Sequence, residues 1–307
     1  MSLITVGTMA FDAIETPFGK TDKIVGGSAL YVAYAASNFV KPVQQISIVG
    51  FDFPEEEMQD LRSRGVHLDG VEIVKDKKSF FWSGRYHADM NSRDTLVTDL
   101  NVLADFDPQV PDSYQGSEFL MLGNLHPLTQ LNVIQELKQR PKLIAMDTMN
   151  FWMESAMSDL KIVLRYVDML IINDAEARQL TGLFSLVKAA KAILEMGPKY
   201  LIIKKGEHGA LLFHEDNVFY APALPLEDVF DPTGAGDTFA GGFMGYLAKS
   251  GDTSFENMKR GIIVGSAMAS FCVEKFGVTR LKEITKPEID NRIRLFKELV
   301  SFEIELV

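Results

Sequence analysis

The sequence has one cysteine and five scattered histidines among its 307 residues. The single cysteine, Cys272, excludes a disulfide framework within the chain and indicates a reducing compartment. With one cysteine and no histidine cluster, a zinc site is not expected. Basic residues are also few, 31 against 42 acidic ones, and the net charge of −11 opposes binding to nucleic acids or anionic membranes.

Long hydrophobic runs and common nucleotide-binding motifs are missing as well. The longest mostly apolar run, Gly261 to Val273, is shorter than the roughly 20 residues that span a bilayer. The first residues show no basic leader before an apolar stretch, so we expect a cytoplasmic protein without a membrane or nucleic-acid partner. No G-x-x-x-x-G-K-[ST] or G-x-G-x-x-G pattern occurs, which excludes a P-loop and a dinucleotide fingerprint.

Short apolar runs alternate with helical patterns along most of the chain. The runs are continuous rather than alternating, as in strands that are buried on both faces of a parallel sheet. Strands are predicted at residues 3–6, 45–49, 119–122, 143–146, 169–172, 200–203 and 210–213, and helices at 29–39, 55–64, 129–139, 174–180, 185–196 and 238–249. This alternation predicts an α/β domain with a mainly parallel sheet.

Residues 12–25 and 76–99 interrupt the alternation with polar, aromatic, strand-like sequence. We predict that they form a small β-sheet, called the lid here, outside an α/β core of residues 1–11, 26–75 and 100–307. By the two-residue period of a strand, Phe80, Trp82 and Tyr86 share one face of this sheet. That face is expected to cover either the substrate or a second subunit, in a homodimer through the lid.

The most informative stretch is the Gly-rich turn Asp231-Pro232-Thr233-Gly234-Ala235-Gly236-Asp237, which precedes a predicted helix. The residues Gly234, Ala235 and Gly236 have almost no side chain, so their backbone N–H groups can face one concavity. The unpaired N–H groups at the start of the helix add to this anion site. Asp237 has the wrong charge to hold a phosphate, but it suits a base that accepts a proton from an attacking hydroxyl. The alternative is a plain N-cap role for Asp237.

The Gly-rich turn closely resembles the signature of the ribokinase-like (PfkB) carbohydrate kinases. Three weaker features agree in the family's order: Gly26-Gly27 before a helix, Asn173-Asp174-Ala175-Glu176 after a strand, and Lys204-Lys205-Gly206-Glu207-His208-Gly209 upstream of the signature. The resemblance extends from Val6 to about Val278. It implies a three-layer α/β/α core with a mainly parallel sheet and a β-sheet lid, ATP as phosphoryl donor, and Mg²⁺.

Through this resemblance, roles are implied for individual residues. Asp237 would be the catalytic base, with the amides of Gly234, Ala235 and Gly236 as the anion hole. The residues that would bind the nucleotide are Asn173, Glu176, Lys205, Gly206, Glu207 and Gly209. Asn173 and Glu176 would also hold Mg²⁺ through water, which suits an ion that dehydrates reluctantly. Taken alone, Asn173 and Glu176 could instead form a helix capping box, and residues 206–209 a plain hairpin turn.

The resemblance also implies an acceptor site. Asp12 would bind substrate hydroxyls, and Gly26 and Gly27 would let the backbone approach the substrate. Some members of the family bind a monovalent cation such as K⁺ near the signature, and Asp231 and Thr233 match two of its positions. Taken alone, Asp12 is a turn or cap residue and the glycine pair is a turn.

Departures from the ribokinase pattern concern the substrate. Ribokinases carry G-G-K-G-A-N where this chain has Gly-Gly-Ser-Ala-Leu-Tyr at residues 26–31, and they have Asn where Ala10 stands. Lys204 replaces the threonine of the family's T-x-G-x-x-G pattern, and Arg85 could pair with an anionic substrate or remain solvated. Residues 147–152, which follow a predicted strand, are expected to line the pocket.

The leading hypothesis is an ATP-dependent kinase that phosphorylates a hydroxyl group of a small sugar or sugar-like substrate. The aromatic residues of the lid support a nucleoside kinase of the same fold as the alternative, since bases stack on aromatic rings. A regulator that binds a nucleotide or sugar without catalysis is the third hypothesis.

Overall fold

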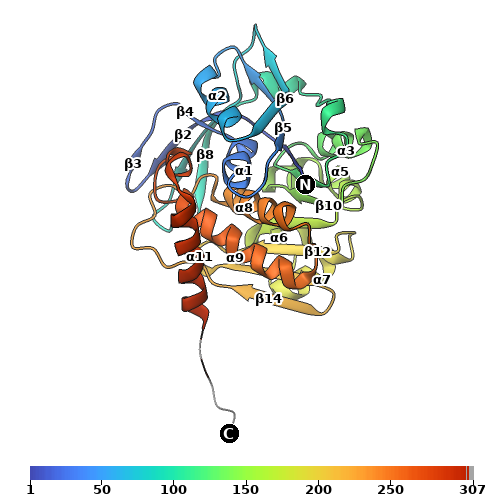
Figure 1. Cartoon of the computed structure of the whole chain (residues 1–307), viewed down its shortest axis with the longest axis vertical. Helices are drawn as coiled ribbons and strands as arrows, with labels where there is room; N and C mark the ends of the chain where they lie inside the picture. Colours follow the sequence, from blue (N-terminus) through green and yellow to red (C-terminus); the bar gives the residue numbers. More distant parts are fainter. Residues whose placement is uncertain (302, 304–307) are drawn as a thin grey trace.

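The computed structural model describes residues 1–301 and 303, so that residues 302 and 304–307 of the predicted core lie outside the described part. The chain folds into a large sheet of nine strands, covered by helices on both faces, and a separate small sheet (Figure 1). Within the described residues, no helix combines the length and the apolar composition that a membrane crossing requires.

The large sheet has the strand order β14-β13-β12-β11-β10-β9-β1-β5-β6. All neighbouring strands run parallel except at the β12–β13 and β13–β14 pairs. Its strands are β1 (Leu3–Val6), β5 (Val43–Gly50), β6 (Val66–Val74), β9 (Phe119–Leu122), β10 (Leu143–Asp147), β11 (Met169–Asn173), β12 (Tyr200–Lys204), β13 (Ala210–His214) and β14 (Asn217–Ala221). Each of the seven strands predicted from apolar runs is present. Strands β6 and β14 were missed, because both are edge strands in which most residues are exposed or half-exposed.

Successive residues of the central strands enter two different hydrophobic clusters, one on each face of the sheet. Leu3 of β1 belongs to the first cluster and Ile4 to the second. The first face is covered by α1 (Ser28–Ala36), α2 (Glu55–Ser63), α8 (Ala235–Ser250), α9 (Phe255–Cys272), α10 (Thr279–Glu283) and α11 (Lys286–Val300). The second is covered by α3 (Pro127–Glu136), α4 (Asn150–Ser155), α5 (Met157–Val163), α6 (Asp174–Thr181) and α7 (Leu186–Leu194). The predicted three-layer α/β/α architecture is confirmed.

The small sheet has the order β3-β2-β7-β8, and β4 pairs with β2. Its strands are β2 (Ala10–Thr16), β3 (Gly19–Lys20), β4 (Ile24–Gly26), β7 (Phe81–Tyr86) and β8 (Arg93–Asp99). The pairing of β2 with β7 is parallel and the other pairings are antiparallel, so this sheet is mixed. A small separate sheet was predicted, and it lies at the left of Figure 1; its strands β2 and β4 reach Ala10 and Gly26, outside the predicted residues 12–25.

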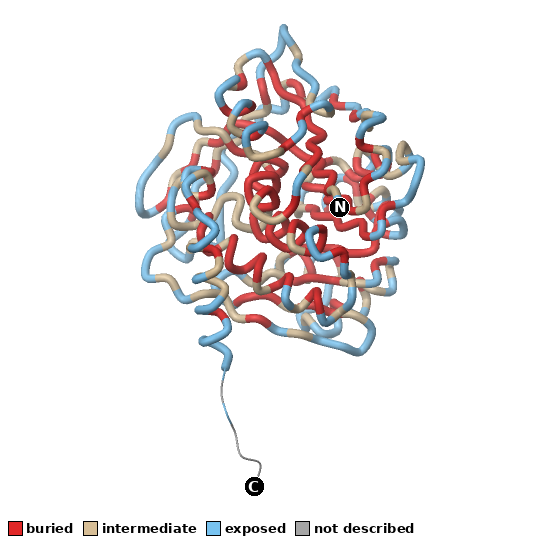
Figure 2. The backbone as a smooth tube through the Cα atoms, in the orientation of Figure 1, coloured by how far each residue is buried: buried red, intermediate tan, exposed pale blue. Residues whose placement is uncertain are grey.

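The helices α1 and α8 form a buried pair in the middle of the molecule (Figure 2). A Cβ atom at Gly241 would lie 2.5 Å from the carbonyl oxygen of Val32, and one at Gly245 would lie 2.8 Å from the Cα atom of Ala36. The glycines therefore let the two backbones approach closely. This packing brings the N-terminus of α1 next to that of α8, where the predicted substrate and phosphate residues lie.

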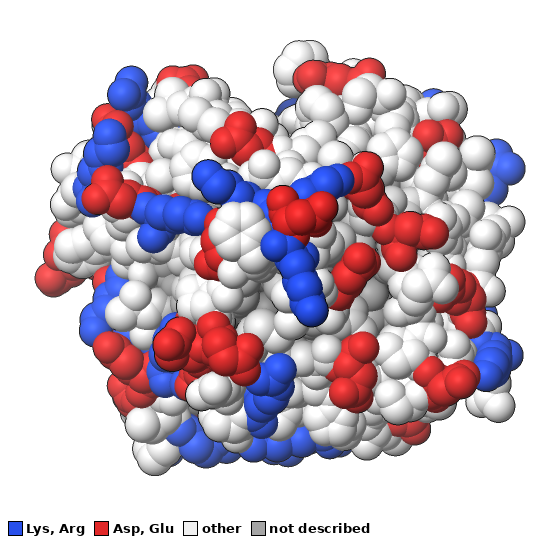
Figure 3. Space-filling model, turned by 90° about the horizontal axis from the view of Figure 1, so that it is seen from above, with Lys and Arg blue, Asp and Glu red and all other residues white. Residues whose placement is uncertain are grey.

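The charged side chains of the surface are mixed in sign. On the face shown in Figure 3, Lys and Arg side chains are interspersed with Asp and Glu. Many exposed cations have an acidic partner, for example Lys77 with Asp105 and Lys138 with Asp112.

Candidate active site

The Gly-rich turn leads directly into the first turn of α8. Gly234 is the N-cap with φ of 73°, a conformation that favours glycine, and the helix begins at Ala235 rather than at Thr238. The N–H of Ala235 donates to the carbonyl of Pro232 at 3.2 Å. The N–H groups of Gly234 and Gly236 have no backbone partner in the described chain. The turn therefore presents free N–H groups at the positive end of a 16-residue helix.

Asp237 lies in this first turn, half-buried, with charged groups from three other elements, β8, β10 and β12, around it. Burial and the nearby carboxylate of Asp147 raise its pKa to about 7, while Lys204 and Arg93 lower it. The carboxyl group thus titrates near neutral pH. It lies beside the free N–H groups of its own helix, which is the placement that a proton acceptor next to an anion site requires.

Three neighbouring strands place polar side chains at their carboxyl ends: Asp147 on β10, Asn173 on β11 and Lys204 on β12. This edge is where parallel sheets bind ligands. Lys204 Nζ lies 3.3 Å from Asp147 Oδ2, and a Cβ atom at Gly236 would lie 2.7 Å from the same nitrogen. The sheet edge and the start of α8 therefore form one site.

Asn173 and Glu176 form a reciprocal capping box at the start of α6. The N–H of Glu176 donates to Asn173 Oδ1, and the N–H of Asn173 donates to Glu176 Oε2, both at 2.8 Å. Burial and Asp147 raise the pKa of Glu176 to about 7. The capping box fixes the Glu176 carboxylate next to the cluster of Asp147, Lys204 and Asp237. The capping interpretation and a role in the site are thus compatible.

Asp12 lies on β2 of the lid with its carboxylate buried against Gly26. Burial and the charges of Asp231 and Asp237 raise its pKa to about 7, while a hydrogen bond from the backbone of Gly27 and the charge of Arg93 lower it. A Cβ atom at Gly26 would lie 1.9 Å from Asp12 Oδ2. Gly27 has φ of 97°, and a Cβ atom there would lie 2.4 Å from the Thr8 carbonyl oxygen. Both glycines are therefore required by the backbone and carboxylate packed around them.

The carboxylate of Asp231 is buried and ties the Gly-rich turn to the chain after α9. Its Oδ1 accepts the N–H of Thr233 and its Oδ2 accepts the N–H of Gly277, both at 2.8 Å. The hydroxyl groups of Thr233 and of Tyr86 on the lid are 3.2 Å apart. The turn is thus linked to the lid as well as to the core.

The lid reaches over the site from β7 and β8. Arg93 lies 5.7 Å from the ring of Trp82 and is close enough to influence the pKa values of Asp12 and Asp237. At the β7–β8 turn, the side chain of Asn91 lies against Gly206, where a Cβ atom would be 2.3 Å from its Oδ1. The lid thus touches the predicted nucleotide loop. Arg85 does not face this site, because it pairs with Glu15 within the lid at 2.8 Å.

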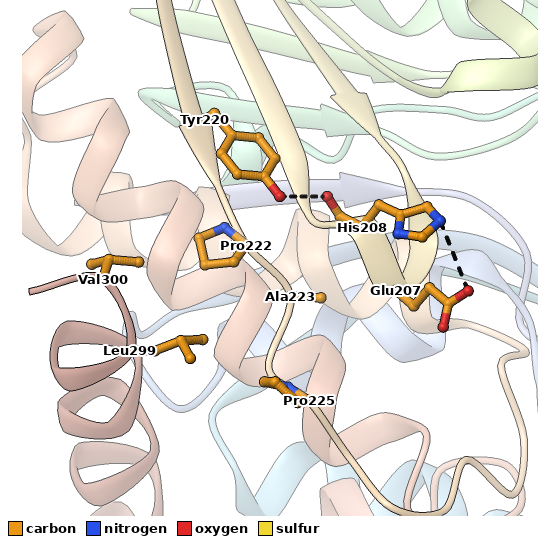
Figure 4. A pocket seen from close by; sticks show the side chains of 8 residues that line it. All are labelled: Glu207, His208, Tyr220, Pro222, Ala223, Pro225, Leu299 and Val300. Carbon is orange, nitrogen blue, oxygen red and sulfur yellow. Dashed lines mark hydrogen bonds and ion pairs between the residues drawn. The ribbon is translucent and has the colours of Figure 1, made fainter.

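Residues 205–209 connect β12 to β13. Gly206 and Gly209 have φ of 55° and 83°, and the N–H of Lys205 donates to the Gly209 carbonyl at 2.8 Å. Next to this loop is an open pocket of about 590 Å³, seen in Figure 4. It is lined by Glu207, His208, Tyr220, Pro222, Ala223, Pro225, Leu299 and Val300. None of these is a member of the charged cluster around Asp237, so the pocket adjoins the loop rather than the reacting centre.

Comparisons with known proteins identify the family. A model described as pfkB family carbohydrate kinase matches residues 2–285. The chain belongs to this family. A cytidine kinase from Thermococcus kodakarensis is 30% identical over 251 residues, which are 80% of this chain and 87% of that kinase.

Solved structures show the same fold. The nucleoside kinase of Methanocaldococcus jannaschii has a TM-score of 0.78 at 20% identity, over 96% of this chain and 99% of that one. The Burkholderia thailandensis nucleoside kinase in complex with inosine has a TM-score of 0.77 at 21% identity, over 96% and 98%. The predicted enzyme class is confirmed: as a pfkB kinase, the chain is a phosphotransferase that acts on an alcohol group.

In this pfkB kinase, the fold brings to the site several side chains for which the sequence alone had suggested no role. Lys204 and Arg93 are the positively charged side chains near Asp237. The ring of Tyr31 lies against Gly234, where a Cβ atom would be 2.4 Å from it. A signal for Lys204 was available, because Lys204 stands where the family's T-x-G-x-x-G pattern has a threonine. Arg93 carries no such signal, because only the position of the lid in the folded chain places it near Asp237.

Kinases of this family use ATP with a divalent metal ion, and the donor set fits one. No group of three His, Cys, Asp or Glu side chains in the described chain is placed to hold a metal directly. Carboxylates nevertheless gather at the strand ends, and burial with mutual repulsion raises the pKa of Glu176 and Asp237. A few carboxylate oxygens that leave most of the coordination sphere open suit Mg²⁺, because this ion keeps several waters and binds phosphate oxygens.

Proposed function

We propose that this pfkB kinase transfers the γ-phosphoryl group of ATP to a hydroxymethyl group of a nucleoside. Asp237 accepts the proton of the acceptor hydroxyl as its oxygen attacks phosphorus. Of the predicted anion hole at Gly234, Ala235 and Gly236, the free amides stabilise the charge on the phosphoryl oxygens. The observation that carries the proposal is the half-buried carboxylate next to free N–H groups at the start of α8. In this structure the free amides are those of Gly234 and Gly236, since the N–H of Ala235 donates to Pro232.

We assign the donor nucleotide to the loop of Lys205, Gly206, Glu207 and Gly209. Gly206 and Gly209 both have positive φ, which lets the chain turn tightly from β12 to β13 beside the pocket. The pocket beside the loop, with Tyr220 and two prolines in its wall, takes the base (Figure 4). Asn173 and Glu176 would hold Mg²⁺ through water, and the ion would supply positive charge that offsets the charge of the phosphate groups.

The acceptor binds between the core and the lid, on Asp12, Gly26 and Gly27. A buried carboxylate can accept two hydroxyl groups of a ribose, and the bare backbone of the glycines lets the sugar approach. The nucleoside is favoured over a free sugar by two observations. The lid presents Trp82 beside Arg93, a flat surface suited to a base, and similar proteins include cytidine and nucleoside kinases. A small free sugar remains the second candidate acceptor.

A ligand panel separates the two acceptors. We expect nucleosides to raise the melting temperature by about 5 °C at 100 times Kd, because a ligand that binds only the folded chain stabilises it by about 2.7 kcal/mol. Ribose, fructose and sugar acids at the same concentration should give no shift. A coupled assay for ADP release with Mg²⁺ and ATP should give the same ranking. Turnover of a sugar with no nucleoside turnover would establish the second candidate instead.

A monovalent cation at Asp231 and Thr233 is also part of the proposal. The Asp231 carboxylate is buried with two backbone N–H donors and no basic side chain bonded to it in the described chain. A cation there would hold the Gly-rich turn in place. We expect K⁺ to raise kcat several-fold when it replaces choline at constant ionic strength. Equal rates in the two salts would remove the cation from the proposal.

A further inference from the structure

Lys204 is the buried cation of the site, and it has one protein partner. Its side chain is 17% exposed, and its Nζ bonds Asp147 Oδ2 at 3.3 Å. An ammonium group has three N–H donors, so two of them have no partner within the described residues. Burial opposes the charge of Lys204, but Asp147, Glu176 and Asp237 outweigh it and raise its pKa. The group therefore remains a cation with free donors.

The position of the ammonium group is fixed by the start of α8. A Cβ atom at Gly236 would lie 2.7 Å from Lys204 Nζ and 3.6 Å from its Cε atom. The end of the lysine side chain thus lies against the first turn of the helix, beside the free N–H of Gly236. Two kinds of donor, backbone amides and an ammonium group, meet next to Asp237, and both kinds bind phosphoryl oxygens.

The contact with Asp147 alone does not account for this arrangement. Glu176 and Asp237 also attract the ammonium group, but neither of them bonds it, so its two other N–H donors remain available beside the helix start. Asp147 is itself at the carboxyl end of β10, and its hydrogen bond directs the lysine side chain along the strand ends toward α8. Asp147 therefore acts as a positioning residue for Lys204.

We propose that Lys204 is a catalytic residue that binds the transferring γ-phosphoryl group. The inference rests on the proposed function and adds to it a side-chain donor to the anion site. As charge spreads over the phosphoryl oxygens in the transition state, the free N–H groups of Lys204 share it with the amide of Gly236. Where the family's T-x-G-x-x-G pattern has an uncharged threonine, this chain has the cation of Lys204.

The experiment compares Lys204→Met with Lys199→Met. Methionine keeps the apolar stem of the side chain without its charge, and Lys199 precedes the same strand but pairs with Asp168 at 3.7 Å on the surface. We expect Lys204→Met to lower kcat by about 100-fold to 1,000-fold, the usual effect of losing one transition-state donor. By calorimetry without acceptor, its Kd for ATP should rise about tenfold or more, with the Kd for ADP unchanged. Lys199→Met should match the parent in all three measurements.

Two results would overturn the inference while leaving the proposed function intact. One is an equal change, or no change, in the Kd values of ATP and ADP. The other is recovery of kcat in the double variant Asp147→Asn/Lys204→Met, which would show that the lysine only neutralises Asp147. We expect the double variant to remain as slow as Lys204→Met. A parent protein that binds neither nucleotide would overturn the proposed function and this inference together.

Discussion

Replacing Asp237 with Asn should lower kcat by about 1,000-fold while leaving the fold intact. The amide keeps the size of the carboxyl group but cannot accept the proton of the acceptor hydroxyl, and general-base catalysis contributes about 10² to 10⁴ in rate. The substrates should still bind, because the amides of Gly234 and Gly236 are unchanged. Initial rates of ADP release at saturating ATP and acceptor measure this effect, with the melting temperature as a check on folding.

The matched control is Asp228→Asn, an exposed aspartate in the loop that precedes the Gly-rich turn. It removes the same charge without touching the site, so its kcat should equal that of the parent. If Asp237→Asn retained a rate within a few-fold of the parent, Asp237 would not be the base, and the proton would have to leave by another route.

The pH dependence gives an independent view of the same group. Burial and Asp147 raise the pKa of Asp237 to about 7. Since the base acts in its ionised form, kcat/KM should fall as the pH is lowered through about 7, and it should level off above that value. Glu176 and Asp12 also titrate near 7 in the free protein. If the Glu176→Gln variant shows the same inflection, Glu176 does not cause it, and the inflection belongs to Asp237 or Asp12.

Replacing Gly26 with Ala should lower kcat/KM for the acceptor by about 100-fold or more. The new Cβ atom would lie 1.9 Å from Asp12 Oδ2, so the carboxylate must move away from the position in which it binds the acceptor hydroxyl groups. Two hydrogen bonds to a charged group are worth about 1.5–3 kcal/mol each, which supports a loss of this size. The Kd for ATP should be unchanged, because Gly26 lies on the lid strand β4, away from the nucleotide loop.

Gly116→Ala is the control, because no heavy atom lies within 4 Å of a Cβ atom at that position. It should match the parent in kcat/KM and in melting temperature. The double variant Asp12→Ala/Gly26→Ala tests the stated cause. If the clash acts only through Asp12, the double variant should be no worse than Asp12→Ala alone, a non-additivity expected for residues in contact. Additive losses would show that Gly26 contributes in another way.

The fold was predictable from the sequence because its signals are local. Strands buried on both faces appear as continuous apolar runs, and the seven predicted from them are all present. Prediction failed at the two edge strands, β6 and β14, since a largely exposed strand has a mixed composition. The start of α8 was placed at Thr238 instead of Ala235, because glycines in a first turn give no helical pattern.

The candidate site was only partly predictable. The Gly-rich turn, the Asn173–Glu176 pair and Asp12 could be named because each occupies a short motif with its own chemistry. The roles of these residues stay predictions until the variants above are measured. Arg85 illustrates the limit of sequence reasoning. The sequence places Arg85 on a lid strand, but it does not show that Arg85 pairs with Glu15 there. Arg93, from the next strand, is the lid arginine that faces the carboxylates.

The sequence by itself determined the family, the layered architecture and the short motifs, because these depend on residue order and on the periodicity of burial. Only the tertiary structure decided which charges act together. Lys204, Asp147, Asp237 and Arg93 are far apart along the chain, and strand order, helix packing and lid position bring them to one edge of the sheet. Electrostatic interaction depends on distance in space and on burial, and neither quantity is a property of a linear sequence.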